Sequence, residues 1–212
     1  MFGTMLWLAV AAQGPVPPKL IRSRTPEYPR MLANRNVDGF ARAQITAAPS
    51  GKVIRCEVVV ESGARELDEA LCAAYAVAKA RPARDADGQP AYGTFTHSIV
   101  YRIGDRSVTT PPMADMSLAV NRLPPGSDPF VRREAALSVS ATGEVVGCHN
   151  LRKEGTPDPL DKALCDVATT RLSLKPALDE QGKPVPSIQQ FVVEFSEPDA
   201  PLVRDDKFRR PL

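Results

Sequence analysis

Histidine is scarce in this chain of 212 residues, which contains only His97 and His149. None of the four cysteines lies in a C-x-x-C motif, so the sequence lacks the spacing typical of a zinc site. Cys148 and His149 are adjacent, but neighbouring residues of a strand point to opposite faces and cannot act as nucleophile and base. We therefore expect no metal site, no cofactor and no enzyme active site.

The chain also lacks an excess of one charge, since it has 27 basic and 25 acidic residues and a net charge of +2. No basic stripe stands out, which argues against nucleic acid as a partner. The one long apolar run, residues 1–12, is shorter than the roughly 20 residues that span a membrane. It looks like a secretory signal without a basic start, and its Ala9-Val10-Ala11 sequence resembles a cleavage site. We therefore predict export.

The sequence does contain a pattern that occurs twice. The first part of the pattern is GKVIRC at Gly51–Cys56 and GEVVGC at Gly143–Cys148. The second part is LDEALC at Leu67–Cys72 and LDKALC at Leu160–Cys165. Both copies then continue with Pro-Ala and Gly-x-Pro. A repeat of this length predicts two copies of one fold.

Hydrophobic periodicity predicts the elements of each copy. Apolar residues alternate from Gly39, a turn signal follows at Pro49–Gly51, and alternation resumes on the next strand. Apolar residues then recur about every four residues, at Leu67, Leu71, Tyr75 and Ala78, which predicts a helix over 67–80. A last strand is expected near Tyr92–Arg102, and the second copy should have its counterpart near Ser187–Phe195. The expected fold class is α+β, with two tandem domains that each have a three-stranded antiparallel sheet and one helix (β-β-α-β).

These patterns divide the chain into six segments. Residues 1–12 are the signal-like segment and 13–25 a Pro-rich lead-in, followed by domain 1 at 26–103. We expect a linker at 104–122, domain 2 at 123–196 and a charged tail at 197–212.

The cysteines occupy matching positions in the two copies, one on a strand and one at the border of the helix stripe. A helix packed on the sheet would bring the two together, either as a disulfide or as two inert buried thiols. Export and the repeated pairing favour the disulfides Cys56–Cys72 and Cys148–Cys165.

The first copy resembles the TonB C-terminal domain family. The resemblance covers roughly Pro26 to Ile103 and rests on motifs in a fixed order: Tyr28-Pro29, Gly39, Gly51, Ser62-Gly63, Leu67-Asp68, Pro82-Ala83 and Gly88-x-Pro90. The second copy keeps the hairpin glycine, Leu-Asp, Pro-Ala and Gly-x-Pro but lacks the Tyr-Pro pair and a match for Gly39.

The resemblance implies a periplasmic module that binds proteins and serves transport across the outer membrane. Its partners would be segments of TonB-dependent outer-membrane receptors, added as a strand to a sheet edge, and inner-membrane motor proteins. The last strand of each copy would be this edge. The implied protein-binding residues are Tyr28, Pro29, Tyr92, Phe95, Ile99 and Tyr101.

Departures from the family leave other functions open. No histidine precedes His97, and only Gly14–Pro18 suggests the long proline-rich spacer of a transducer. The alternative is therefore a soluble periplasmic interaction or structural protein that does not transduce energy. Unpaired sheet edges also allow a homodimer.

Overall fold

The protein is mixed α+β and consists mostly of sheet in the computed structural model, which describes residues 14–102, 113–152 and 158–198. The three helices of these residues are α1 (Arg30–Ala33), α2 (Arg65–Tyr75) and α3 (Pro159–Arg171). The long strands are β2 (Gly39–Ala47), β3 (Val53–Val60), β7 (Gly93–Tyr101), β9 (Phe130–Val139), β10 (Val145–Asn150) and β13 (Ser187–Ser196). The short strands are β1 (Lys19–Arg22), β4 (Lys79–Arg81), β5 (Ala83–Arg84), β6 (Pro90–Ala91), β8 (Met116–Ala119), β11 (Ala177–Leu178) and β12 (Pro184–Val185).

The first half of the chain contains β2, β3, α2 and β7, and the second half contains β9, β10, α3 and β13. Gly51 and Gly143 have φ angles of 81° and 90° in the turns between the first two strands of each half. Only glycine adopts this region without strain, which explains why it occurs in both hairpins. The expected order of strand, strand, helix, strand is thus present in each half, with the last strands close to their predicted bounds.

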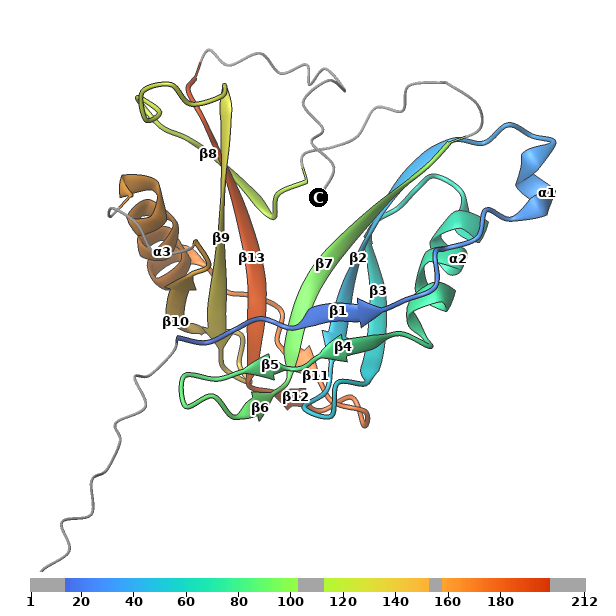
Figure 1. The fold of residues 1–212 in the computed structure, drawn as a ribbon, viewed down its shortest axis with the longest axis horizontal. Helices are drawn as coiled ribbons and strands as arrows, with labels where there is room; N and C mark the ends of the chain where they lie inside the picture. The colour runs from blue at the N-terminus through green and yellow to red at the C-terminus, as the bar shows by residue number, and fades with distance from the viewer. Residues whose placement is uncertain (1–13, 103–112, 153–157, 199–212) are drawn as a thin grey trace, which may run out of the picture.

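A single seven-stranded sheet joins the two halves, in the order β10-β9-β13-β7-β2-β3, with β8 also paired to β13. The two expected three-stranded sheets are therefore parts of one sheet. β7 and β13 are parallel and pair only at Gly93 with Ile188 and Thr94 with Gln189. Beyond this point the strands diverge, and α2 and α3 lie on the outer sides of the resulting V (Figure 1). We call the opposite side of the sheet, which faces into the V, the inner face.

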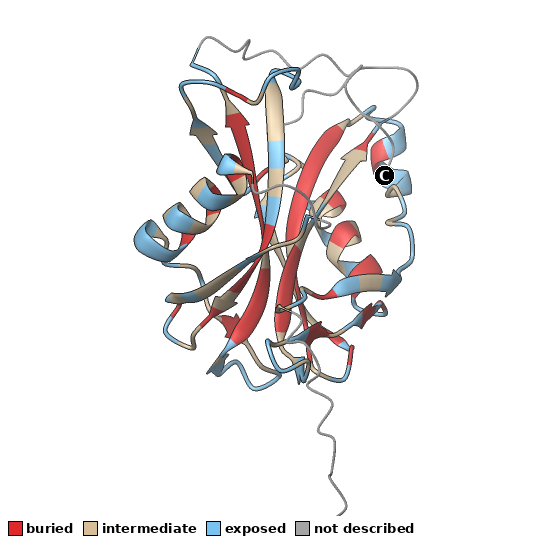
Figure 2. Ribbon diagram, turned by 60° about the vertical axis from the view of Figure 1, so that its left-hand side comes forward, coloured by how far each residue is buried: buried red, intermediate tan, exposed pale blue. Residues whose placement is uncertain are grey.

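Each half has its own hydrophobic core between sheet and helix (Figure 2). Ala41, Ala43 and Ile45 of β2 are fully buried against Leu67 and Leu71 of α2. The amphipathic helix thus forms where the leucine spacing predicts it, because it buries this stripe.

The predicted end of this helix at Ala80 was wrong, because α2 ends at Tyr75. Lys79–Arg81 forms β4 instead, which pairs antiparallel with β1. Pairing with a strand of the Pro-rich lead-in therefore overrides the alanine-rich helical pattern.

Both predicted disulfides are present. Cys56 is bonded to Cys72, and Cys148 to Cys165, with a Cα–Cα distance of 5.5 Å in each pair. Each bond ties a strand to the helix that packs on it.

Several predicted segments lie partly outside the described residues. The signal-like segment is entirely outside, as are the last residue of the expected domain 1, 104–112 of the expected linker and 199–212 of the tail. Within the rest of the expected linker, Met116–Ala119 forms β8 and belongs to the sheet.

Candidate functional site

The outer edge of β7 is the candidate binding surface. One side of β7 pairs with β2 along its whole length, from Gly93 to Tyr101. On the other side β13 covers only Gly93 and Thr94. Within the described ranges, no strand pairs with Phe95–Tyr101 on that side. The backbone there can accept another strand.

Strand alternation indicates which backbone groups face this edge. The carbonyl of Tyr92 accepts a hydrogen bond from Ile188 N of β13 at 2.9 Å, so Tyr92 faces outward. N–H and C=O groups of every second residue point the same way along a strand. Thr96, Ser98 and Val100 therefore present their backbone groups on the open edge.

The side chains that the sequence assigned to partner binding are mostly part of the core. Phe95 and Tyr101 are only 6% and 4% exposed, and Ile99 packs against the same cluster. The Tyr101 hydroxyl donates to the carbonyl of Leu67 at 2.9 Å, and burial, with a smaller contribution from Asp68, raises the pKa of Tyr101 to about 12. These three residues can hold the edge in place but offer a partner little side-chain surface.

The Tyr28-Pro29 pair also has structural contacts. Tyr28 donates to the carbonyl of Val37 at 2.7 Å and meets the ring of Tyr101 edge-on, with centroids 6.3 Å apart. Pro29 is the residue before α1. Tyr92 is placed differently, with its hydroxyl 3.4 Å from a carboxylate oxygen of Glu180 in the second half. The structure thus brings Tyr28 and Tyr101 together, whereas Tyr92 belongs to the junction of the halves.

The equivalent edge in the second half is occupied. β8 pairs parallel with β13 from Val193 to Ser196, and β9 pairs with the whole other side of β13. The prediction that Ser187–Phe195 forms an exposed edge was therefore wrong. Met116, Leu118 and Val120 of this region pack against the second core. Their alternation was the sequence signal for β8, and it was hidden in a segment interpreted as a linker.

Asp115 anchors β8 between the two halves. Its amide donates to the Val192 carbonyl at 2.7 Å, and its carboxylate accepts from Val192 N at 2.8 Å. The same carboxylate pairs with Arg42 of β2 at 2.9 Å. Burial raises the pKa of Asp115, although Arg42 and the Val192 amide act in the opposite direction. One carboxylate thus connects β8, β13 and the inner face of the first half.

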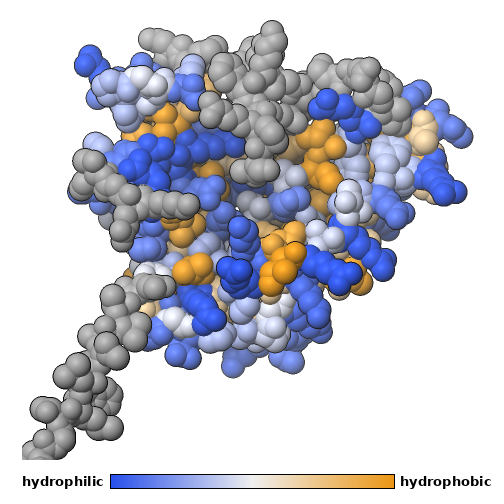
Figure 3. Space-filling model, in the orientation of Figure 1, coloured by the Kyte–Doolittle hydropathy of each residue, from blue (hydrophilic) through white to orange (hydrophobic). Residues whose placement is uncertain are grey.

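A cleft of about 440 Å³ lies beside this anchor. Strands β2, β3 and β7 form one wall, and the start of β8 with the two residues before it forms the other. The lining residues are Arg42, Gln44, Val59, Val60, Thr96, Ala114, Asp115, Met116 and Ser117. In the view of Figure 3, apolar side chains form separate patches among hydrophilic ones. The side of the molecule seen in this view therefore does not present one broad apolar surface.

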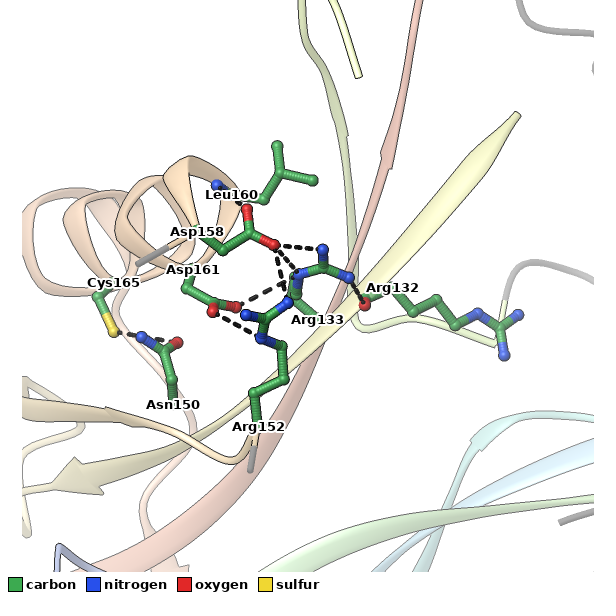
Figure 4. A network of polar contacts seen from close by, with 8 residues as sticks. All are labelled: Arg132, Arg133, Asn150, Arg152, Asp158, Leu160, Asp161 and Cys165. Carbon is green, nitrogen blue, oxygen red and sulfur yellow. Dashed lines mark hydrogen bonds and ion pairs between the residues drawn. The ribbon is translucent and has the colours of Figure 1, made fainter. Parts of the chain in front are cut away.

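A second polar cluster surrounds the start of α3 (Figure 4). Asp158 accepts from Leu160 N at 2.9 Å, and its carboxylate also pairs with Arg133 and with Arg152. Asp161 pairs with the same two arginines. Burial alone would raise the pKa of Asp158, but the Leu160 amide and the arginines outweigh it and lower the pKa. The carboxylates are thus engaged in capping and ion pairs, so we assign this cluster to stability.

His97 is a further titratable group with a structural contact. The side chain of His97 contacts the Tyr75 hydroxyl, and burial lowers the pKa of this histidine. Among the described residues, no group of three or more His, Cys, Asp or Glu side chains could hold a metal ion. No described helix is long and apolar enough to cross a membrane.

One comparison with known proteins, a match to a family model, agrees with the sequence resemblance. Residues 24–103 match the family model for the Gram-negative bacterial TonB protein C-terminal. Among solved structures, the solution NMR structure of the Pseudomonas aeruginosa TonB CTD is 26% identical over 42% of this chain and 90% of that chain, with a TM-score of 0.36. No curated protein matches this chain. The family match covers the half that contains the open edge of β7.

Proposed function

We propose that this chain binds an extended segment of an outer-membrane receptor, because residues 24–103 match the family model of the TonB C-terminal domain. The segment would add to the sheet at the open edge of β7. The family is linked to TonB-dependent transport, and we propose that this binding is the chain's part in it. The module would act in the periplasm, where a receptor segment and any inner-membrane motor protein can reach it.

The observation that carries this proposal is the unequal use of the two equivalent edges. In the second half, β8 adds in parallel to the last strand and supplies backbone hydrogen bonds. In the first half the same kind of edge is left without a described partner over Phe95–Tyr101. Unpaired strand edges bind extended peptides through main-chain hydrogen bonds. The chain would therefore bind one receptor segment rather than two.

A homodimer would need a different surface. β3 and β10 are the end strands of the sheet order. Pairing of two copies through either strand would leave the edge of β7 open. Self-association and receptor binding are thus separable proposals.

Peptide binding to the full chain tests the proposed function. Fluorescent peptides from the periplasm-facing segments of TonB-dependent receptors should bind with a measurable Kd. Ser98→Pro removes an N–H that faces the open edge while leaving the pairing with β2, and should weaken binding at least tenfold. Ser98→Ala is the matched control and should bind like the parent. Equal binding by a folded Ser98→Pro protein would contradict the assignment of the edge.

A further inference from the structure

We propose that the first half of the chain binds the surface of a bilayer that contains anionic phospholipids, through the outer face of β1 and β4. This interaction is additional to receptor binding and does not depend on it. It is carried by four cations and by the exposed apolar side chains beside them. The cations, which we call the basic ribbon, are Lys19 and Arg22 of β1 and Lys79 and Arg81 of β4.

The four cations of the basic ribbon lie on one face of the two strands, which run side by side across the front of the first half (Figure 1). Lys19 is opposite Arg81, and Arg22 is opposite Lys79. Ala80 is 4% exposed and points inward, so its two neighbours on β4 point outward. Residues directly opposite each other share a face. All four cations are exposed, so the strands present two pairs of like charges to solvent.

The basic ribbon has no acidic counterpart. None of the ion pairs among the described residues involves it. Lys52, whose backbone bridges to Lys79 on the other side of β4, adds a fifth exposed cation. Residues 14–26, 48–56 and 76–84 meet here and contain no Asp or Glu. The resulting positive potential favours an anionic partner, and it is not evident in the sequence because the three segments are far apart.

Exposed apolar side chains favour a bilayer over a soluble anion. Ile21 is left unpaired by the register shift in β1 and is 67% exposed. Val77, shortly before β4, is 60% exposed, and Val16, shortly before β1, is 43% exposed. Cations and apolar groups on one surface bind membrane interfaces, because the charges meet the headgroups while the apolar groups enter the acyl boundary. A nucleic acid or a soluble phosphate would leave these apolar side chains in water.

Sedimentation of the full chain with vesicles tests the proposal. Vesicles of phosphatidylcholine and phosphatidylglycerol should bind about tenfold more tightly than vesicles of phosphatidylcholine alone. The difference should vanish in about 0.5 M NaCl, because salt screens exposed charges. The apolar residues 1–12 would bind both kinds of vesicle alike. Equal binding to the two kinds of vesicle at low salt would therefore overturn the proposal.

A double substitution tests the charges. Arg22→Gln with Lys79→Gln removes one opposed pair and should weaken binding to the anionic vesicles about tenfold. It should not lower the stability, because like charges repel each other across the two strands. Arg171→Gln with Lys183→Gln is the control, since it removes two exposed cations of the second half and changes the net charge equally. This control should bind like the parent, and an equal loss in both double variants would contradict the assignment to the basic ribbon.

A single substitution tests the apolar contact. Ile21→Ser should weaken binding to the anionic vesicles about fivefold and keep the salt dependence, because it removes a side chain that enters the bilayer. Unchanged binding by this variant would indicate a site for any polyanion and would overturn the assignment to a membrane. The Kd for a receptor peptide should stay unchanged in every variant, because no residue of the basic ribbon belongs to the open edge of β7. The peptide measurement thus separates this inference from the proposed function.

Discussion

Gly93 lies where the two halves meet, and no side chain fits at its position. A Cβ atom added there would lie 2.6 Å from Ala83 Cβ, 2.7 Å from Pro18 Cδ and 2.8 Å from the carbonyl oxygen of Ile188. Only glycine lets β7 and β13 approach so closely. The sequence shows a glycine after Tyr92. Glycine is needed there because of contacts with segments distant in the chain, which local patterns do not reveal.

Gly93→Ala should therefore destabilise the protein. We expect a loss of about 1–3 kcal/mol in the free energy of unfolding, because the neighbouring backbone must shift. Urea unfolding measures this loss in the free energy of unfolding. Gly147→Ala is the control, since the added Cβ would be 3.4 Å from the Ser138 side chain, an ordinary contact. A Gly93→Ala protein as stable as the Gly147→Ala protein would contradict the close crossing.

The cluster at the start of α3 predicts a pH-dependent contribution from one carboxylate. Asp158→Ala removes a helix cap and two ion pairs and should cost about 1–2 kcal/mol at pH 7. The folded pKa of Asp158 lies below its ordinary value, so this contribution is complete above the ordinary pKa and is lost as pH falls through the folded pKa. Asp158→Asn should therefore lose less stability on acidification than the parent.

Urea unfolding at pH 7 and pH 3 checks this prediction. Asp166→Asn is the control, because Asp166 forms an exposed ion pair with Lys162 at 2.5 Å on the same helix. Exposed pairs contribute little, so this variant should change the stability by less than about 0.5 kcal/mol. If Asp158→Asn and Asp166→Asn changed the free energy of unfolding equally, Asp158 would have no special role.

At the scale of elements, the cysteines were the most predictable feature. Repeated positions on a strand and a helix indicated which cysteines meet, because a helix packed on a sheet brings those positions together, and the expected export favoured disulfides over buried thiols. Replacing Cys56 and Cys72 by alanine together, or Cys148 and Cys165 together, should each cost about 3 kcal/mol. Thiol titration of the unreduced, denatured parent should find no free thiol. Four free thiols in protein recovered from the periplasm would refute the pairing.

The short strands were much less predictable. β4 has three residues and no hydrophobic pattern, and the alternation of apolar residues at β8, which has four, is too short to distinguish a strand from a linker. Both form because a distant strand is available: β13 for β8, and β1 for β4. The amphipathic helices and long strands, in contrast, follow from local periodicity because each buries one face.

At the scale of the whole molecule, the repeat predicted two similar halves but not their union into one sheet. The junction contains a small core of Ala83, Ala136 and Ile188, and an exposed ion pair between Lys175 and Glu57 at 2.5 Å also spans it. None of these contacts follows from residues near each other in the sequence. The sequence located β7 and proposed its edge for strand addition, but it also assigned Phe95 and Tyr101 to partner binding, and their side chains are buried in the core.

The central claim is that the chain offers one open edge, on β7, and closes the equivalent edge with β8. Amide NMR spectra of the full chain, recorded with and without a receptor peptide, test it most directly. We predict shift changes at Thr96, Ser98 and Val100, saturation at one peptide per chain and unchanged amides in β8 and β13. Changes centred on Val193–Ser196, with β8 displaced by the peptide, would contradict the account.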